Sequence, residues 1–251
     1  MNNIYCVCTT PEGFVHYGEY WNNFKCDNDL IIIADCTTGN VSGQNIFKFT
    51  EEQLRRQLNF NKVVPASHWW NSQNNRNITW FYAYLRMLNF YQQYPNYEYY
   101  WFFDDDAIIT NSQAFFNGFT NDTSDFIAHF CFKNVGITAQ SKVPVIDDNT
   151  YSKLDWFKRF PGNGDCMPKD AKDLFGSFFD VVRFSNEAMQ YLLELNNKKF
   201  AGYGEGYVPT VLNAKGFELS TIIGKDNKSM YFDTDKVNII HKGVKTDWQW
   251  I

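Results

Sequence analysis

Apolar residues in the first half of the chain occur in short runs that end in polar residues. Residues 3–10 read NIYCVCTT, residues 29–36 read DLIIIADC, residues 97–103 read YEYYWFF and residues 125–132 read DFIAHFCF. The unbroken Leu-Ile run of the second segment is typical of a parallel strand that is buried on both faces. Each of the four segments is predicted to form a strand.

Helical patterns separate these runs. Residues 50–60 begin with a Thr cap, followed by acidic residues and then by basic ones, the order that the helix dipole favours. Residues 77–94 are largely apolar and stop before Pro95, which predicts a second, longer helix. Residues 174–200 are expected to form one strand and then a helix capped at Ser185.

The remaining segments are less regular. Residues 134–170 are polar and interrupted by Pro and Gly, so a lid or an acceptor-binding excursion is expected there. Residues 202–219 begin with a Gly-rich turn and predict a helix that stops at Gly216. Residues 237–251 are expected to add a short strand and an aromatic tail.

Strands that alternate with helices predict an α/β fold with a doubly wound sheet. We interpret residues 1–251 as one domain, with a nucleotide-binding half at about 1–133 and an acceptor half at about 134–251. Ligands of such sheets bind outside the carboxyl ends of the strands. Polar residues at predicted strand ends are therefore candidates for a binding site: Thr9, Thr10, Asp35, Asp104, Asp105 and Asp106.

Three of these candidates are consecutive carboxylates that directly follow YYWFF. Residues two apart in a strand point the same way, so Asp104 and Asp106 are expected to project together while Asp105 faces elsewhere. Two carboxylates about 4 Å apart repel by roughly 4 kcal/mol at an effective dielectric constant near 20. Either one of them keeps a proton, or a cation such as Mg²⁺ or Mn²⁺ lies between them. The alternative is a solvated turn in which one Asp caps a helix beginning near Ser112.

Composition narrows the classes of ligand. The chain has a net charge of −5 and a pI near 5.4, which argues against a nucleic-acid partner. A phosphorylated ligand would then be expected to bring a divalent cation. Aromatic residues make up 19% of the chain, enough to provide stacking surfaces for a base or a sugar, although a Tyr- and Asn-rich coding bias explains them equally well.

Cysteine usage and hydropathy predict the compartment. The six cysteines contain no C-x-x-C pair, and we interpret all six as reduced, which predicts a cytoplasmic location. Four N-x-S/T sequons are expected by chance in an Asn-rich chain. We expect no signal peptide and no transmembrane segment, since no apolar run approaches about 18 residues, while peripheral association with a membrane stays open.

The segment WFFDDDAII resembles the metal-binding Asp-x-Asp motif of nucleotide-sugar glycosyltransferases of the GT-A fold. In that family the first and third positions hold a Mn²⁺ or Mg²⁺ ion that bridges the donor diphosphate. The resemblance assigns the metal to Asp104 and Asp106 and leaves Asp105 at the variable middle position of the donor site. It also implies a mixed, Rossmann-like nucleotide half joined to an acceptor half.

A second resemblance lies near the C-terminus. IIHKGVKTDW is similar to a tail segment of several GT-A families, in which a His completes the metal shell and a Lys contacts the diphosphate. This implies metal binding by His241, diphosphate binding by Lys245 and closure of Trp248 over the donor. The spacing departs from the best-known pattern, His-x-x-Gly-x-x-Lys-Pro-Trp, and the Pro is missing. A structural role for His241 on an apolar strand is the alternative.

Two carboxylates are candidates for the catalytic base. Glu205 lies between glycines in GYGEGYVPTVL, where we expect it to be exposed and mobile at a helix start. The segment resembles the acceptor-side acidic motif of inverting GT-A enzymes. A first-turn Glu that favours the helix dipole is the alternative, and Asp180 in SFFDVV is the rival base.

The same resemblance implies contacts to the rest of the donor. Thr9, Thr10 and Asp35 lie where the family binds the base and ribose, and Arg86 on the long helix could reach the diphosphate. Burial of the aliphatic part of Arg86 with its charge at the surface is an equal alternative. The resulting hypothesis is a glycosyltransferase that moves a sugar from a nucleoside diphosphate sugar, most simply UDP-linked, to a glycan or other hydroxyl acceptor with inversion.

Three other hypotheses remain open. A metal-dependent phosphohydrolase or nuclease would also use clustered carboxylates, but its ligands usually come from several separated segments. A carbohydrate-binding module would use surface aromatics, but such modules are typically all-β. A relative of the transferases that has lost catalysis would keep the fold and the ligand contacts.

Overall fold

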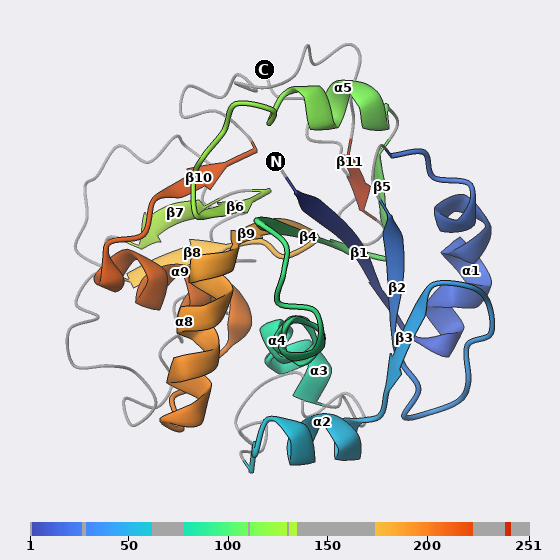
Figure 1. Cartoon of the computed structure of the whole chain (residues 1–251), viewed down its shortest axis with the longest axis horizontal. Coiled ribbons are helices and arrows are strands. Elements are labelled where there is room, and N and C mark those ends of the chain that lie inside the picture. The colour runs from blue at the N-terminus through green and yellow to red at the C-terminus, as the bar shows by residue number, and fades with distance from the viewer. Residues whose placement is uncertain are drawn as a thin grey trace, which may run out of the picture.

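The computed structural model describes residues 2–26, 29–61, 78–109, 111–129, 131–134, 174–222 and 239–241. Within these residues, seven strands form the main sheet in the order β10-β6-β9-β4-β1-β2-β3 (Figure 1). Their bounds are β1 Asn3–Thr9, β2 Leu30–Asp35, β3 Ile46–Phe49, β4 Tyr99–Asp104, β6 Phe126–Ala128, β9 Val181–Ser185 and β10 Leu219–Thr221.

Helices and two small sheets complete the described fold. The helices are α1 Pro11–Asn22, α2 Glu51–Gln57, α3 Ile78–Phe81, α4 Tyr84–Gln93, α5 Ser112–Asn117, α8 Asn186–Asn197 and α9 Gly204–Lys215. The small sheets pair β5 Ala107–Ile109 with β11 Ile239–His241, and β7 Cys131–Asn134 with β8 Leu174–Ser177.

The main sheet is mixed, which confirms the predicted α/β class. Strands β1, β2, β3 and β4 are parallel, and β9 runs antiparallel to both β4 and β6. The chain leaves β1 toward β2 and β3 on one side, and it later returns to place β4 on the other side of β1. The carboxyl ends of β1 and β4 therefore form a topological switch point, the place where ligands bind in open α/β sheets.

Strand β4 is buried on both faces, as its aromatic run predicts. Tyr100 and Phe102 belong to the larger apolar core, together with residues of α2, α4, α8 and α9. Trp101 and Phe103 point the opposite way, into a second core with α1 and α5. Both cores depend on this strand, so the position of its last residue, Asp104, is fixed by packing on two sides.

Several predicted elements have different boundaries in the structure. The helix expected over residues 77–94 is divided into α3 and α4, and residues 174–200 contain two strands before the helix instead of one. The sequence interpretation missed α1, β3, β5 and β10. The three strands are short, and the apolar residues of α1 do not recur with a clear helical period. The helix expected near Ser112 is present as α5, but Asn111 caps it and β5 separates it from the three aspartates.

Two further expectations concern membranes and cysteines. No helix among the described residues is long and apolar enough to cross a bilayer. Cys6, Cys8, Cys36 and Cys131 are free thiols, as the sequence interpretation expected of them. Burial raises the pKa of the Cys8 thiol to about 12, so this side chain behaves as a small core residue.

Phe103→Ala should destabilise the protein by about 3–5 kcal/mol, because it removes a fully buried ring from the second core and leaves a cavity beneath β4. Chemical denaturation monitored by circular dichroism measures this change. Val15→Ala is the control, since Val15 on α1 is 82% exposed and its truncation should change the free energy of unfolding by less than about 0.5 kcal/mol. Equal effects of the two variants would contradict the central role of β4.

Candidate active site

The switch point brings together polar residues from three strand ends. Cys8 pairs with Asp104 in the β1–β4 register, so Thr9 and Asp105 follow side by side. The backbone N–H of Asp104 donates to the carbonyl oxygen of Asp180 at 2.8 Å, which joins the start of β9 to the end of β4. Thr9, Asp104 and Asp105 therefore lie along one edge of the sheet, as expected from their positions at strand ends. Asp180, which the sequence suggested only as the rival base, joins them because it directly precedes β9.

Asp104 is held by Arg86. A guanidinium nitrogen of Arg86 on α4 donates to Oδ1 of Asp104 in a short ion pair. Burial lowers the pKa of Arg86, but the neighbouring negative groups, among them Asp104 and Asp105, raise it overall, so the guanidinium stays charged. The alternative in which Arg86 places its charge at the surface is wrong, because α4 directs the side chain to the end of β4.

Asp105 faces away from Asp104, as the strand geometry predicts. Its Oδ2 accepts a hydrogen bond from the hydroxyl of Thr9 at 2.5 Å, and the backbone N–H of Thr10 also donates to the carboxylate. A Cβ atom added to Gly13 would lie 1.7 Å from Asp105 Oδ2, so this carboxylate needs a glycine in the first turn of α1. Burial raises the pKa of Asp105, and the Thr9 hydrogen bond opposes that shift.

Asp106 follows at the turn that begins β5. His241 of β11 is paired with Ala107 in the antiparallel register of β5 and β11. The backbone of His241 therefore lies next to the residue that follows Asp106, although the two are far apart in sequence. This places the predicted third metal ligand within the same small region of the fold, at the level of the backbone.

Asp180 forms a buried pair with His129. Its Oδ2 lies 2.6 Å from Nδ1 of His129, and its Oδ1 accepts a hydrogen bond from the backbone N–H of Val181 at 2.9 Å. The Asp180 side chain is fully buried, whereas His129, at the end of β6, retains 15% of its side-chain exposure. These contacts favour a positioning role for Asp180 over direct contact with an acceptor.

Glu205 is buried, which corrects the expectation of an exposed and mobile carboxylate. It is only 8% exposed because α9 begins against the segment between β8 and β9. Its Oε1 accepts from the backbone N–H of Phe179 at 3.2 Å, and its Oε2 accepts from the hydroxyl of Tyr203 at 2.5 Å. The flanking glycines therefore do not make this carboxylate mobile.

The environment of Glu205 changes its acidity. Burial is the main cause that raises the pKa of Glu205 to about 8, while the hydrogen bonds from Tyr203 and Phe179 lower it. The charges of Asp104 and Asp180 raise it further, which shows that the three carboxyl groups share one electrostatic environment. A carboxyl group with a pKa near the working pH can both hold and release a proton.

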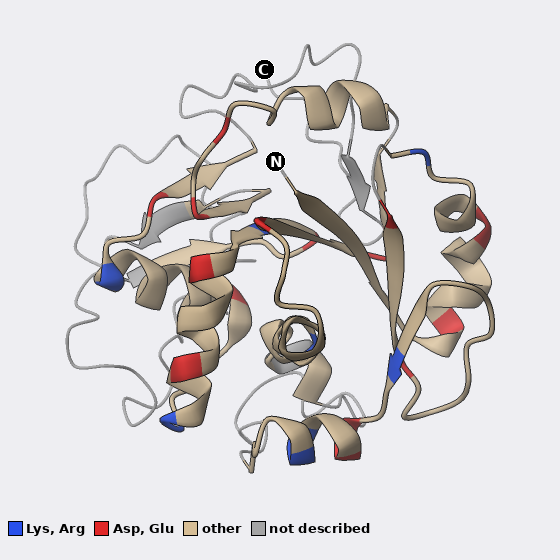
Figure 2. Ribbon diagram, in the orientation of Figure 1, with Lys and Arg blue, Asp and Glu red and all other residues tan. Residues whose placement is uncertain are grey.

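Negative groups outnumber positive ones at this edge. Among the described residues, five carboxyl groups gather there, from Asp104, Asp105, Asp106, Asp180 and Glu205, and the guanidinium of Arg86 on α4 pairs with that of Asp104. In Figure 2, Lys and Arg are distributed over several helices, strand β3 and the connecting segments of the described chain. The local excess of negative charge favours an added cation.

Asp104 and Asp106 fit a hard divalent cation in their chemistry, because carboxylate oxygens are the preferred protein ligands of Mg²⁺ and Mn²⁺. Such a cation commonly takes one or two carboxylates and completes its shell with water and phosphate oxygens. Among the described residues, no group of three or more His, Cys, Asp or Glu side chains is arranged around a common point. The fit therefore rests on two carboxylates and on the backbone placement of His241.

The predicted base and ribose contacts are engaged within the chain. The hydroxyl of Thr10 caps α1 by accepting from the N–H of Gly13 at 3.1 Å. Asp35 is 4% exposed, and its two oxygens accept from Thr37 and from the hydroxyl of Thr79 at 2.9 Å. Asp35 thereby fixes the turn after β2 and the start of α3.

Other predicted residues cannot be placed. Lys245 and Trp248 lie outside the described part of the chain, as does most of the acceptor-binding excursion expected at residues 134–170. Three residues that shape the site were missed from the sequence: His129, Tyr203 and Gly13. His129 lies inside the single strand predicted at residues 125–132, so the strand-end argument passed over it; in the structure β6 ends at Ala128, directly before His129. Nothing in the sequence distinguishes Tyr203 from other tyrosines.

Comparison with known proteins gives low similarities. No family model and no curated protein matches the sequence. Among solved structures, the chain is similar to the galactosyltransferase LgtC in complex with donor and acceptor sugar analogs, with 8% identity over 95% of this chain and 86% of LgtC and a TM-score of 0.43. For an active-site mutant of LgtC, the identity is 10%, the match covers 87% of this chain and 72% of the mutant chain, and the TM-score is 0.42.

A third solved structure is core-mannan synthase A (CmsA) from Aspergillus fumigatus in its Mn/GDP form. The identity is 12% over 88% of this chain and 72% of CmsA, and the TM-score is 0.34. Because these identities and TM-scores are low, the roles of individual residues are inferred from the contacts within this chain alone.

Tyr203→Phe should raise the pKa of Glu205 above its value of about 8. The Tyr203 hydroxyl donates to Oε2, which stabilises the ionised carboxylate, so its removal favours the protonated form. Carbon-13 NMR titration of labelled Glu side chains measures this pKa, and Glu205→Gln identifies the signal. An unchanged or lower pKa in Tyr203→Phe would contradict the inferred hydrogen bond.

The pH dependence of stability gives a second measure of the same shift. The folded pKa of Glu205 lies above the ordinary value of 4.5, so its contribution to stability is complete below about 4.5 and is lost as the pH rises through about 8. The free energy of unfolding should therefore fall over this window relative to that of Glu205→Gln. Tyr203→Phe should extend the fall to higher pH.

Proposed function

We propose that the chain is a glycosyltransferase that moves a sugar from a nucleoside diphosphate sugar, most simply a UDP-sugar, to a hydroxyl group of a glycan or similar acceptor. The observation that supports this most is the carboxylate cluster at the switch point of the sheet, where Asp104 pairs with Arg86 and lies near a second, protonatable acid, Glu205. A departing diphosphate needs positive charge, and an incoming hydroxyl needs a base.

Asp104 and Asp106 are proposed to bind a divalent cation together with the donor, with His241 as a third ligand. When bound, such a cation would supply Lewis-acid neutralisation of the leaving diphosphate. Arg86 holds the Asp104 carboxylate through its guanidinium, and the same guanidinium would add positive charge for the phosphate groups of a donor. Lys245 and Trp248 are proposed as further donor contacts by resemblance alone.

Glu205 is proposed as the group that removes the proton from the acceptor hydroxyl. Its pKa of about 8 makes the carboxylate a stronger base than an ordinary Glu, while a fraction is ionised at neutral pH. Tyr203 and the N–H of Phe179 fix the orientation of its two oxygens. A single base is what an inverting displacement requires, and Asp180, enclosed by His129 and Val181, is proposed to position the end of β4.

We propose an indirect role in nucleotide binding for Thr9, Thr10 and Asp35, the residues at the ends of β1 and β2. Thr9 orients Asp105 across the switch point, and Thr10 and Asp35 build the turns that surround a bound nucleotide. Their side chains already have partners in the chain, so any direct contact to a base or ribose would come at the cost of one of these hydrogen bonds.

UDP together with Mn²⁺ should raise the melting temperature, whereas UDP without the metal should have little effect. Ligands that bind the folded state stabilise it by mass action, so the shift should grow with UDP concentration. Asp104→Asn combined with Asp106→Asn should abolish the metal-dependent shift, as measured by differential scanning fluorimetry. Asp125→Asn is the matched control, because Asp125 lies at the opposite end of the sheet, where it holds Ser185 and Glu218.

A metal-independent shift, or an equal metal-dependent shift in the double variant, would contradict this assignment. Turnover of bis-nitrophenyl phosphate with Mn²⁺, without hydrolysis or transfer of any UDP-sugar, would favour the phosphohydrolase hypothesis instead.

Glu205→Gln should reduce turnover by at least about 100-fold while changing donor affinity by less than about threefold, because a proton acceptor acts in the chemical step and not in nucleotide binding. UDP release from a panel of UDP-sugars with glycan acceptors measures turnover, and calorimetry with UDP and Mn²⁺ measures affinity. Equal losses in the two measurements would remove Glu205 as the base.

A further inference from the structure

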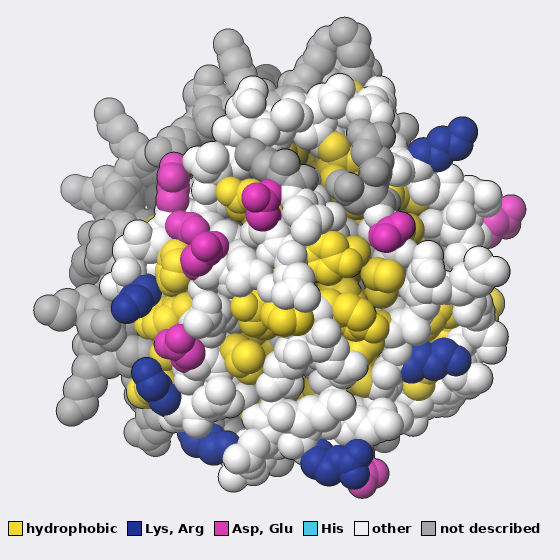
Figure 3. All heavy atoms as spheres, in the orientation of Figure 1, with side chains coloured by type: hydrophobic (Ala, Val, Ile, Leu, Met, Phe, Trp, Pro, Cys, Tyr) yellow, Lys and Arg dark blue, Asp and Glu magenta, His cyan; other side chains and the backbone are white. Residues whose placement is uncertain are grey.

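Two adjoining hollows are lined by residues that do not belong to the carboxylate cluster. The segment that joins α4 to β4 runs between them, with α8 on one side and β2 and β3 on the other (Figure 1). Figure 3 shows hydrophobic side chains gathered across the middle of this face, between the positions of α4, α8 and β3. The hollows have volumes of about 600 and 460 Å³, and Tyr97 lines both of them.

The smaller hollow combines aromatic rings with amide side chains. Its floor is apolar, with Phe47 and Phe90, and its rim carries the amides of Asn45, Gln57 and Gln93. Lys48 is the charged residue among those that line it, and its Nζ donates to Asn40 Oδ1 at 3.0 Å. Aromatic faces bordered by amides bind polyhydroxylated, uncharged ligands, because CH groups pack on the rings and hydroxyl groups bond to the amides.

Tyr94 provides an exposed ring that is rigidly supported. It is 46% exposed, and Val15 is the other large hydrophobic residue with high exposure among the described residues. One face of the ring stacks on Phe90 with centroids 4.9 Å apart, and Phe47 contacts it edge-on at 6.2 Å. A ring that is fixed on one side and exposed to solvent on the other loses little entropy when a ligand stacks on it.

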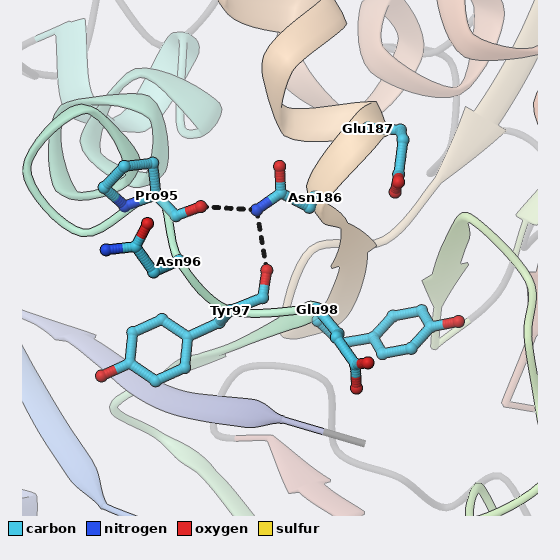
Figure 4. A pocket seen from close by; sticks show the side chains of 7 residues that line it. Pro95, Asn96, Tyr97, Glu98, Asn186 and Glu187 are labelled. Atoms are coloured by element: carbon cyan, nitrogen blue, oxygen red, sulfur yellow. Dashed lines mark hydrogen bonds between the residues drawn. The ribbon is translucent and has the colours of Figure 1, made fainter.

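The larger hollow continues the same surface toward α8. Figure 4 shows Asn186 reaching from the start of α8 to the carbonyl oxygens of Pro95 and Tyr97, at 2.6 and 2.7 Å, which fixes the shape of the α4–β4 segment. The side chains of Asn96, Glu98 and Glu187 line this hollow. Carboxylates and amides accept hydrogen bonds from sugar hydroxyl groups, and the two carboxylates repel phosphate and other anions.

This surface is separate from the proposed active site. The larger hollow adjoins the amino end of β4 at Tyr99, and the smaller hollow lies along β3, three strands away from β4 in the sheet, whereas Asp104 lies at the carboxyl end of β4. At about 3.3 Å per residue, the two ends are about 16 Å apart. A ligand in the hollows therefore does not occupy the carboxylate cluster.

We propose that the two hollows form one extended binding groove for a neutral oligosaccharide chain, with Tyr94 and Tyr97 as stacking residues. The inference does not depend on the proposed sugar transfer, because the groove is remote from Asp104 and needs neither nucleotide nor metal. If both hold, the groove would retain a polymeric acceptor while its end reacts elsewhere.

The charge of the lining favours a neutral glycan over other occupants. An anionic polysaccharide would be repelled by Glu98 and Glu187, and among the described residues Lys48 is the single cationic one that lines the two hollows. A peptide that extends the sheet would need the free edge of β3, and it would be insensitive to the ring of Tyr94, which belongs to the α4–β4 segment.

Native gel electrophoresis in the presence of soluble polysaccharides tests this proposal. The panel contains dextran, mannan, galactomannan, mixed-linkage β-glucan and xylan as neutral probes, and polygalacturonate as the anionic probe. We expect at least one neutral probe to retard the wild-type chain, without UDP or Mn²⁺, and polygalacturonate not to. Tyr94→Ala should weaken that binding at least about tenfold, the loss expected for removal of a central aromatic contact.

Matched variants separate binding from folding. Tyr94→Phe should keep the retardation because it keeps the ring, and Gln57→Ala combined with Gln93→Ala should weaken it without touching the apolar floor. Val15→Ala should change nothing, and melting temperatures should verify that each variant is folded. Retardation by polygalacturonate alone, by no neutral probe, or equally in Tyr94→Ala would overturn the proposal, whatever the outcome of the UDP and Mn²⁺ measurements.

Discussion

Repulsion between the carboxylates that gather at the end of the buried strand β4 is the constraint that organises this protein. Strand β4 is packed on both faces, so Asp104 cannot move away from the switch point to relieve repulsion. The structure responds by separating the carboxylates: Arg86 pairs with Asp104, Thr9 and the first turn of α1 hold Asp105, and Asp180 binds His129. Each partner comes from a different element, which ties helices and strands to this edge.

The remaining charge affects acidity and ligand preference. Glu205 lies in the same environment, and its pKa of about 8 reflects burial first, opposed by the hydrogen bonds from Tyr203 and Phe179, with a smaller rise from Asp104 and Asp180. Burial and negative surroundings together make a site that attracts a cation and contains a strong carboxylate base. The proposed glycosyl transfer uses both properties. Sites of this kind cost stability, because buried acids in the ionised state are poorly solvated, and the surrounding hydrogen bonds offset part of that cost.

The two ends of the sheet have different chemistry. The carboxyl ends of β1 and β4 collect charged residues with fixed partners, whereas the surface at the amino end of β4 is formed by supported aromatic rings, amides and two carboxylates. The same strand thus connects a charged site with a largely neutral groove about 16 Å away. The inferred groove and the proposed active site suit successive parts of one glycan chain.

The sequence by itself determined the class of fold, the strands that begin with Asn3, Leu30 and Tyr99, and the gathering of polar residues at their carboxyl ends. Those features follow from local patterns of apolar residues, which act over a few positions. Only the tertiary structure decided the partners: Arg86 with Asp104, His129 with Asp180, and Tyr203 with Glu205. Glu205 was expected to be exposed because glycines flank it, and its burial depends on how α9 packs beside β8 and β9, which no local pattern encodes. Burial and pairing arise from contacts between residues far apart in the chain, so they appear only when the sheet is assembled.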